Sequence, residues 1–338
     1  MNTGTTTETA ESCGAPGIDP LLTSFQSTSV QPEHRRSAMG SPPSDEWQRV
    51  RAVGWDVSEG WARSDGVWLA GSGAAVDYPL EGHAALDVAS SYWHDHRAAV
   101  VAAMLRRVSP NRAIWDVGAG TGSMASRLKA AAFDVVAVEP LPAGAAALAR
   151  NFNGDVVCGT LADLQLPTGS IGAVGLFDVL EHLADPTALL AEVRRVLVSC
   201  GAGIAIVTVP ALNWLWSDED DVAGHHRRYR RAELDRLMRR SGFEPIETTY
   251  IFAILVPVAA VVRALPYRLG RRRSSDEILA AMKSQLLPRP WLERAIREVL
   301  HAESRVARLV RLPVGLSVVG VYRTAERSVM ARTAPSAR

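Results

Sequence analysis

The sequence lacks an excess of either charge. Its 37 lysines and arginines are balanced by 36 aspartates and glutamates, which leaves a formal net charge of +1 at pH 7. No global field therefore recruits a polyanion, and we expect no nucleic-acid partner. The three cysteines, Cys13, Cys158 and Cys200, lie too far apart in the sequence to suggest a redox or metal-ligand pair. Their isolation favours a reducing compartment and thus a cytoplasmic location.

An apolar run long enough to cross a membrane is also missing. The uncharged stretch from Tyr250 to Val262 has thirteen residues and is interrupted by Pro257, so it is too short to span a bilayer. The preferred interpretation is a strand end that runs into a buried helix. Because arginines follow, peripheral contact of 250–273 with a membrane interface stays open as the alternative. Those arginines are Arg263, Arg268, Arg271, Arg272 and Arg273.

Periodic apolar residues are scarce at both ends of the chain. Residues 1–45 are rich in Ser, Thr, Gly, Pro and Gln and predict a disordered tail, with no basic segment before an apolar core that would mark a signal peptide. Residues 46–90 alternate tryptophans with Gly and Asp turns, as a small β-hairpin cap or extension would. We expect the main domain over 91–325 and a second tail over 326–338.

A glycine-rich segment carries the strongest signal. Asp116-Val-Gly118-Ala-Gly120-Thr-Gly122 lies between a short apolar run and a helical pattern that begins at Ser123. Glycines allow a sharp turn and the close approach of a ligand, and the helix that follows offers free N–H groups. Further on, the apolar run Val135 to Val138 ends in Glu139, whose carboxylate can accept hydrogen bonds from a ribose diol.

Two cofactor classes use this arrangement. A dinucleotide site needs G-x-G-x-x-G, but Ser123 stands where the third glycine belongs, and an acid at position 116 is not part of that fingerprint. D-x-G-x-G-x-G with an acid-tipped second strand resembles instead the site of class I S-adenosylmethionine-dependent methyltransferases. An ordinary glycine turn would leave Glu139 unexplained. The resemblance implies S-adenosyl-L-methionine as the cofactor, bound by Asp116, Gly118, Ala119, Gly120, Gly122, Glu139 and Pro140.

The elements around this segment alternate between strand and helix. That alternation predicts a parallel, doubly wound α/β sheet. A further strand at 315–322 follows an insert at 252–311. In class I methyltransferases the last strand lies antiparallel beside the sixth, so the resemblance implies a Rossmann-like seven-stranded sheet and a helical, substrate-side insert. We expect strands at 112–117, 134–139, 154–158, 171–177, 203–209 and 243–250, and helices at 91–108, 122–132, 142–151, 186–198 and 231–240.

Two segments after the third and fourth strands extend the resemblance. In the family, an acid after the third strand binds the adenine amino group and the next apolar residue packs on the ring, which here are Asp163 and Leu164. Thr160 replaces a common Asp of that segment, and a simple polar loop remains the alternative. The tip of the fourth strand faces the methyl sulfur in this fold, which adds Phe177 and Asp178 to the expected cofactor-binding residues.

The segment Phe177-Asp-Val-Leu-Glu-His182 looks like that of type-11 and ubiquinone-pathway methyltransferases. In some quinone-pathway enzymes an acid three residues before a Glu-His pair holds a metal, and Asp178, Glu181 and His182 have that spacing. The Glu-His pair is nevertheless widespread in methyltransferases without a metal. We therefore expect no metal and assign Glu181 and His182 to the start of a helix and to the substrate pocket.

A polar loop follows the fifth strand. The run from Pro210 to Tyr229, which contains Gly-His225-His226-Arg227-Arg228-Tyr, is similar to a bacterial type-11/type-12-like subgroup of methyltransferases, as is Ser91 to Arg97. The loop lies at the edge where open α/β sheets bind ligands. A histidine there can act as a general base, and Arg227 and Arg228 can bind an anion. The candidate bases are His225, His226 and His182; a solvated charged loop is the alternative.

The sequence thus predicts S-adenosylmethionine-dependent methyl transfer to a small or lipid-like, isoprenoid-like or otherwise apolar acceptor, with oxygen the favoured acceptor atom. Three alternatives stay open. One is a repurposed fold that binds the cofactor without methyl transfer, because fold does not fix function. The others are a partner-binding subunit without catalysis and a dinucleotide-dependent oxidoreductase. The pattern does not indicate an oligomeric state.

Overall fold

The computed structural model describes residues 62–64, 67–69, 91–108, 113–197, 203–274, 276–278, 280–281, 289–307 and 312–325. All of them belong to the larger of two units, Pro42–Arg338. The predicted tails at 1–45 and 326–338, and most of the predicted extension at 46–90, lie outside these described ranges.

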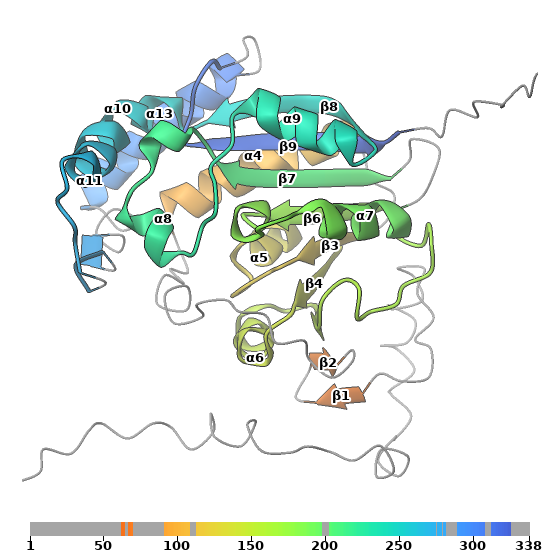
Figure 1. Cartoon of the computed structure of the whole chain (residues 1–338). Coiled ribbons are helices and arrows are strands. Elements are labelled where there is room, and N and C mark those ends of the chain that lie inside the picture. The colour runs from red at the N-terminus through yellow and green to blue at the C-terminus, as the bar shows by residue number, and fades with distance from the viewer. Residues whose placement is uncertain are drawn as a thin grey trace, which may run out of the picture. The chain divides into compact units, whose positions relative to one another are not determined.

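A mixed sheet forms the centre of the described structure, with strand order β1-β2-β5-β4-β3-β6-β7-β9-β8 (Figure 1). From β2 to β7 neighbouring strands pair in parallel, whereas β9 pairs antiparallel with both β7 and β8. The strands are β1 (Ala62–Ser64), β2 (Val67–Leu69), β3 (Ile114–Val117), β4 (Val135–Glu139), β5 (Asp155–Cys158), β6 (Ala173–Phe177), β7 (Ile204–Pro210), β8 (Phe243–Ile251) and β9 (Ser317–Thr324).

Seven neighbouring strands of the sheet are the seven that the sequence predicts, including the antiparallel last strand. In sheet order they are β5, β4, β3, β6, β7, β9 and β8. The described sheet has nine strands because β1 and β2 form an antiparallel hairpin whose second strand pairs with β5. Val67 lies opposite Val156, and Val67 and Trp68 are buried. Part of the segment 46–90 therefore extends the sheet along its edge.

Helices flank the sheet, with α7 and α9 on one face and α4 and α5 on the other (Figure 1). Each presents an apolar stripe at helical spacing: α7 buries Leu190 and Val193, and α9 buries Leu234 and Met238. The helices are α4 (Tyr92–Val108), α5 (Ser123–Ala130), α6 (Pro142–Asn151), α7 (Thr187–Val196), α8 (Asp218–Val222) and α9 (Arg231–Arg240), with short 3₁₀ turns η2 (Leu180–His182) and η3 (Asn213–Leu215).

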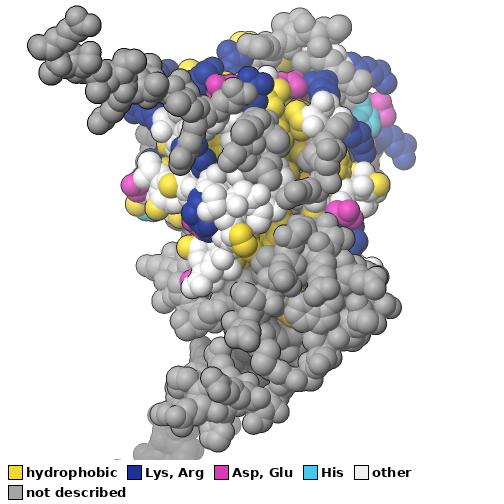
Figure 2. All heavy atoms as spheres, turned by 90° about the vertical axis from the view of Figure 1, so that its right-hand side faces the viewer, with side chains coloured by type: hydrophobic (Ala, Val, Ile, Leu, Met, Phe, Trp, Pro, Cys, Tyr) yellow, Lys and Arg dark blue, Asp and Glu magenta, His cyan; other side chains and the backbone are white. Residues whose placement is uncertain are grey.

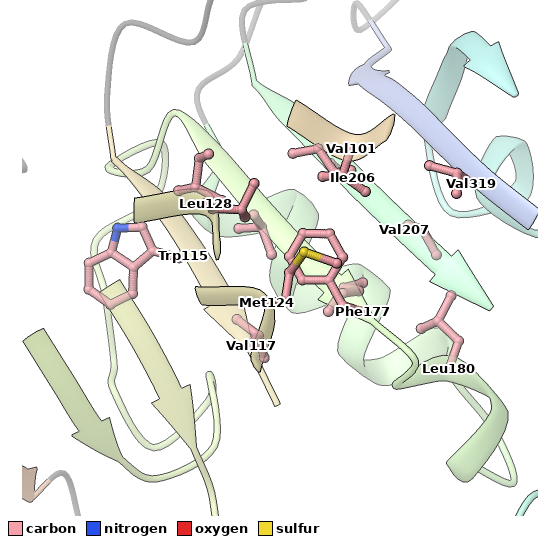
Figure 3. Close-up of a cluster of buried hydrophobic side chains, with 14 of the residues drawn as sticks. Val101, Trp115, Val117, Met124, Leu128, Phe177, Leu180, Ile206, Val207 and Val319 are labelled. Atoms are coloured by element: carbon pink, nitrogen blue, oxygen red, sulfur yellow. The ribbon is translucent and has the colours of Figure 1, made fainter. Parts of the chain in front are cut away.

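The core lies between the central strands and these helices. Its strands are buried on both faces, as parallel strands in doubly wound sheets are, and β3, β4 and β6 are buried throughout. This packing fixes the carboxyl ends of β3, β4 and β6, from which the site is built. Figure 3 shows Val101 of α4, Trp115 and Val117 of β3, Met124 and Leu128 of α5, Phe177 of β6 and Ile206 and Val207 of β7 in this cluster.

The insert between β8 and β9 is helical where it is described. It consists of η4 (Ala253–Leu255), α10 (Val256–Ala259), the π-helical η5 (Ala260–Ala264), α11 (Leu265–Arg268) and α13 (Pro290–Ala307). The preferred interpretation of a buried helix is wrong for one of its faces, because Val258 and Val261 are exposed while Val256 and Ala259 are buried. In the described ranges, no helix combines the length and apolar character needed to cross a bilayer.

Candidate active site

The glycine segment forms the turn between β3 and α5, and a side chain is disfavoured at each of its three glycines. Gly118, Gly120 and Gly122 have φ values of 78°, 55° and 87°, in the left-handed region that disfavours side chains. A Cβ on Gly122 would lie 2.4 Å from Leu148 Cδ1, and one on Gly118 would lie 2.8 Å from Val179 Cγ2. A Cβ on Gly120 would meet nothing within 4 Å. The turn is therefore packed on two sides and open at Gly120, where a ligand can reach the backbone.

Two buried carboxyl groups flank this opening. Glu139, at the end of β4, accepts hydrogen bonds from the amides of Gly120 (2.8 Å) and Leu141 (3.1 Å). Asp116 is buried, and neither of its carboxyl oxygens has a hydrogen-bond partner of normal geometry among the described residues. Burial raises the pKa of Asp116 to about 7, and the charge on Glu139 adds to the effect. Burial also raises the pKa of Glu139.

These features fit the predicted cofactor. A ligand that brings a positive charge and hydroxyl donors would satisfy both the unpartnered carboxyl of Asp116 and the remaining acceptor positions of Glu139. S-adenosylmethionine has a sulfonium, an ammonium and a ribose diol, and Gly120 leaves room for its approach. Ala119 ties the turn to the adjacent strand, since its amide donates to Val138 O at 3.0 Å.

The other predicted cofactor residues lie in the loops after β4, β5 and β6. Pro140 is half-buried directly after Glu139. Asp163 Oδ2 accepts hydrogen bonds from the amide and the hydroxyl of Thr160, at 2.9 and 2.6 Å. Thr160, the departure from the family pattern, thus closes the turn with Asp163 and occupies one of its oxygens. Leu164 and Phe177 are buried.

Asp178 is held by residues that the sequence analysis did not assign. Its φ is 57°, its Oδ2 pairs with Arg97 of α4, and its Oδ1 accepts the hydroxyl hydrogen of Thr208 at 2.8 Å. Burial opposes ionisation, but Arg97 and Thr208 outweigh it and keep the pKa of Asp178 below its usual value. Arg97 ends the segment Ser91 to Arg97 that resembles the methyltransferase subgroup, but nothing in the sequence indicates that α4 packs beside the end of β6.

Three polar side chains converge beyond the end of β6. The rings of His182 and His225 meet edge to face, with centroids 4.7 Å apart. Glu181 is fully buried, and neither of its carboxyl oxygens has a hydrogen-bond partner among the described residues. Burial and the nearby Asp178 raise the pKa of Glu181 well above its usual range. Ligand-capable atoms of Glu181, His182 and His225 lie within 4.8 Å of one another, which is a spacing that can hold a metal ion.

His225 is oriented by a carboxylate that sequence reasoning had not paired with it. Its Nδ1 lies 2.8 Å from Asp220 Oδ1. Arg228 binds both oxygens of Asp220, through Nε and Nη2 at 2.8 Å each. Although burial favours the neutral acid, the hydrogen bonds from His225 and Arg228 lower the pKa of Asp220 to about 2. A charged Asp220 fixes the proton of His225 on Nδ1 and leaves Nε2 as an acceptor.

The remaining predicted residues of this loop lie elsewhere. His226 is exposed, and its amide donates to Glu181 O at 2.8 Å. Arg227 donates to the backbone oxygens of Leu183 and Ala184. The predicted anion-binding role of Arg228 disagrees with the structure, because its guanidinium is engaged by Asp220 in the bidentate geometry that arginine favours.

The short helix α8 joins this loop to the insert. Glu219 pairs with Arg263 at 2.8 Å, and Asp218 pairs with Arg273 at 3.3 Å. Tyr267 donates its hydroxyl hydrogen to Asp221 at 2.8 Å. Three of the four acids of α8 therefore face the insert, while Asp220 faces His225. In Figure 1, α8, α10 and α11 lie together on the left, beyond the ends of β6 and β7.

A cavity of about 270 Å³ lies between α4, β8 and α13. Its apolar lining includes Val100, Met104 and Ile251, with His96 and Ser304 among the polar residues. Next to it, the rings of Trp93 and Phe252 stack with centroids 3.8 Å apart, and His96 lies 5.0 Å from Phe252. The cavity thus borders the start of the insert.

Comparison with known proteins matches the sequence of this chain to methyltransferases. A family model described as a methyltransferase domain matches residues 92–248. A probable S-adenosylmethionine-dependent methyltransferase of Mycolicibacterium smegmatis is 27% identical over 212 residues, which cover 62% of this chain and 78% of that protein. An uncharacterized methyltransferase of Mycobacterium tuberculosis H37Rv is 33% identical over 132 residues, 39% of this chain and 48% of that protein. The match thus spans about half the length of this second relative.

Among solved structures, a possible histamine N-methyltransferase from Thermotoga maritima overlaps with a TM-score of 0.42 at 20% identity, over 69% of this chain and 91% of that one.

Proposed function

We propose that this chain, a class I S-adenosylmethionine-dependent methyltransferase, transfers a methyl group to a hydroxyl oxygen of a small, lipid-like acceptor. One observation carries the choice of oxygen. His225, oriented by the buried carboxylate of Asp220, lies at the carboxyl ends of β6 and β7, where a base is needed to deprotonate a hydroxyl group. A soft carbon nucleophile would not require this arrangement.

The cofactor would be bound by the turn from Asp116 to Gly122, by Glu139 and Pro140, and by Asp163, Leu164, Phe177 and Asp178. S-adenosylmethionine, when bound, supplies an electrophilic methyl group on a sulfonium. The residues of the chain hold the acceptor in line with that group and exclude water. Asp116 and Glu139 provide negative charge and hydrogen-bond acceptors, and Gly120 leaves the backbone open.

His225 acts as the general base in this proposal. Asp220 accepts the hydrogen on Nδ1, so the lone pair of Nε2 is available to the hydroxyl hydrogen of the acceptor. Asp220 remains charged at neutral pH because its pKa is lowered to about 2, and it stabilises the imidazolium that forms. Burial and the nearby Asp178 raise the pKa of Glu181, and this proposal assigns the role of base to His225, the side chain that Asp220 orients. His182 would position the acceptor beside His225.

The apolar surroundings support a lipid-like acceptor. The segment from Tyr250 to Val262 carries no charge. The cavity of about 270 Å³ beside α4 and α13 is lined by charged residues such as Arg107 and Glu247 as well as apolar ones, and its apolar part, with Val100 and Met104, suits an alkyl or isoprenoid chain. An acceptor of this kind resides in membranes, which keeps open the contact of 250–273 with a membrane surface as a separate question.

The test uses the lipid extract of a strain that lacks the gene, since such a strain accumulates the unmethylated acceptor. Incubation with methyl-labelled S-adenosylmethionine should place the label in an organic-soluble product that is heavier by one methylene and is an O-methyl ether or ester. His225→Gln and Asp220→Asn should lower kcat by about 10²- to 10⁴-fold with little change in cofactor affinity. His226→Gln is the matched control, because His226 is exposed, and should leave the rate unchanged.

Two results would overturn the proposal. One is tight cofactor binding with no transfer to any extract fraction, which would point to binding without catalysis. The other is transfer to nitrogen or carbon at a rate that His225→Gln does not alter. Dialysis against EDTA adds a further arm: transfer should persist, whereas a loss restored by Zn²⁺ would reassign Glu181, His182 and His225 to a metal ion, because two imidazoles and a carboxylate suit that ion.

A further inference from the structure

A helical run in the insert exposes an apolar face. Six apolar residues of η4, α10, η5, α11 and the residue after it are between 49% and 67% exposed. They follow one another at intervals of four, three, one, three and four residues, which places them on one side of a helix. The six are Ile254, Val258, Val261, Val262, Leu265 and Leu269, and we call them the insert stripe.

The opposite side of the same run is also apolar, but it is covered. Val256, Ala259 and Ala264 are buried, and Arg263 points toward α8, where it pairs with Glu219 at 2.8 Å. A surface helix normally buries one apolar side and turns polar residues to water. This run is apolar on both sides, and packing among the residues that the structure describes accounts for only one of them. The insert stripe therefore calls for a second apolar surface.

Within its own sequence, the segment that carries the insert stripe has charges of one sign, and the acids beside it come from α8 and from Glu303 of α13, which accepts from the amide of Ile254 at 3.0 Å. From Tyr250 to Ser275 the sequence has five arginines and no aspartate or glutamate. Arg263, Arg272 and Arg273 bind the acids of α8. Arg268 and Arg271 are exposed and form no ion pair with any residue of the described ranges. Figure 2 views the molecule from the side opposite α10 and α11 of Figure 1, and there Lys and Arg side chains lie beside Asp and Glu.

We propose that the insert stripe docks onto the surface of an anionic lipid bilayer, with its apolar side chains at the boundary between headgroups and acyl chains and with Arg268 and Arg271 on lipid phosphates. An apolar helix face flanked by arginines matches the two layers of such a surface. This inference rests on the proposed function only in its purpose, which is to bring a lipid-like acceptor to His225.

Docking here would place the membrane beside the catalytic loop. The arginines next to the insert stripe hold α8, and α8 carries Asp220, which orients His225. An acceptor that leaves the bilayer at this point has a short path to the ends of β6 and β7.

A second copy of the chain fits the insert stripe less well. In a twofold dimer the same patch would meet itself, so Arg268 and Arg271 would face their own copies with no acid of the segment between them. A bilayer with anionic headgroups instead compensates that charge. Because the stripe is apolar and its flank is basic, a neutral bilayer should bind less tightly than an anionic one.

Sedimentation with lipid vesicles tests the proposal on the full chain. Vesicles of phosphatidylglycerol and phosphatidylcholine should bind the protein, and vesicles of phosphatidylcholine alone should bind it weakly. Val258→Ser with Val261→Ser should lower the partition coefficient by about tenfold or more. Arg268→Gln and Arg271→Gln should each lower it by about fivefold at low salt. Ile246→Ser and Arg240→Gln change exposed residues outside the insert stripe and should leave it unchanged.

Three results would overturn the proposal: no binding to anionic vesicles, equal binding by the serine variant, or a dimer in solution that the serine variant dissociates. Cofactor affinity, measured on every variant, shows that each still folds. The outcome is separable from the proposed function. Vesicle binding without methyl transfer to lipid would refute that function alone, whereas transfer to lipid in detergent without vesicle binding would refute docking alone.

Discussion

The two halves of the site are held together in different ways. On the cofactor side, polar side chains bind backbone groups no more than 19 residues away: Glu139 accepts from the amides of Gly120 and Leu141, and Asp163 accepts from Thr160. On the acceptor side, side chains bind other side chains across long stretches of sequence. Tyr267 and Asp221 are 46 residues apart, and Arg273 and Asp218 are 55 residues apart.

This difference shows that local sequence determines the cofactor side of the site but not the acceptor side. A strand, a glycine turn and an acid at the next strand end create the cofactor side almost unaided, because the sheet fixes their positions. The acceptor side exists only after α4, α8, the loop with His225 and the insert have come together. Its ion pairs should therefore respond to salt and to distant substitutions, whereas the glycine turn should respond mainly to local packing.

The largest effect is expected at Gly122. Gly122→Val should destabilise the protein by about 2–5 kcal/mol. It forces a branched side chain into the left-handed backbone region, and its Cβ would overlap with Leu148. Gly120→Ala should lose only about 1–2 kcal/mol of stability, since its Cβ meets nothing within 4 Å, but it should weaken cofactor binding by filling the opening. Urea denaturation and titration calorimetry measure the two quantities. Equal stability losses would show that the turn is not packed as described.

Asp116 should make the free protein sensitive to pH. Its folded pKa of about 7 exceeds the usual value of 3.8, so the folded state keeps a proton that the unfolded state has lost between those values. Stability should therefore fall as the pH rises from about 4 to about 7 and stay low above it. Asp116→Asn removes this loss, so without cofactor it should be more stable than the parent at pH 8, by up to about 4 kcal/mol, and equal to it near pH 4.

The same Asn variant should bind the cofactor less tightly, which separates stability from function at one position. Thermal denaturation across pH 4 to pH 8, with and without cofactor, is the measurement. A stability difference that does not change with pH would contradict the titration of Asp116.

Glu139→Ala should weaken cofactor binding by roughly 1–3 kcal/mol, the usual loss for hydrogen bonds to a charged group. Glu139→Gln is the matched control, since it keeps an acceptor oxygen for one of the two amides, Gly120 or Leu141, which donate to different oxygens of Glu139, and it should lose less. Calorimetry with S-adenosylmethionine checks both variants. Undiminished affinity in the alanine variant would remove Glu139 from the cofactor site.

The smallest effects are expected among the ion pairs of the acceptor side. Asp218→Asn should destabilise the protein by about 1 kcal/mol, because Asp218 is buried against Arg273 and Arg272, and the loss should shrink in high salt. Glu244→Gln breaks the exposed pair with Arg323 and should stay within about 0.5 kcal/mol. Equal losses for the two variants would mean that α8 gains nothing from contact with the insert.

The sequence was sufficient to predict the helices and strands with regular apolar spacing and the glycine turn between β3 and α5. The helices Pro142–Asn151 and Arg231–Arg240 have the bounds that the sequence predicts, 142–151 and 231–240, and the antiparallel last strand followed from the family resemblance. The hairpin β1–β2 could not be placed on the sheet from its turns alone. Edge pairing depends on which strand is free, and sequence spacing does not reveal that.

The acceptor side was predicted less well because its contacts are not local. In the sequence, Asp218 to Asp221 is a run of four acids with nothing to tell them apart, yet Asp220 orients His225 and the other three contact the insert. Arg228 appeared free to bind an anion because its partner Asp220 lies across a turn. The uncharged run after Tyr250 predicted burial, and only the structure shows that a short helix has one covered side and one exposed side.

The position of β9 also sets an order of assembly during synthesis. Strands β3 to β6 and their helices leave the ribosome first and can pair with one another at once. Strand β9 lies between β7 and β8, so those two strands wait beside a gap until residues 317–324 emerge. A nascent chain can therefore form the cofactor turn before it can bind an acceptor, and until then the edge of β7 that β9 will cover exposes unpaired backbone N–H and C=O groups.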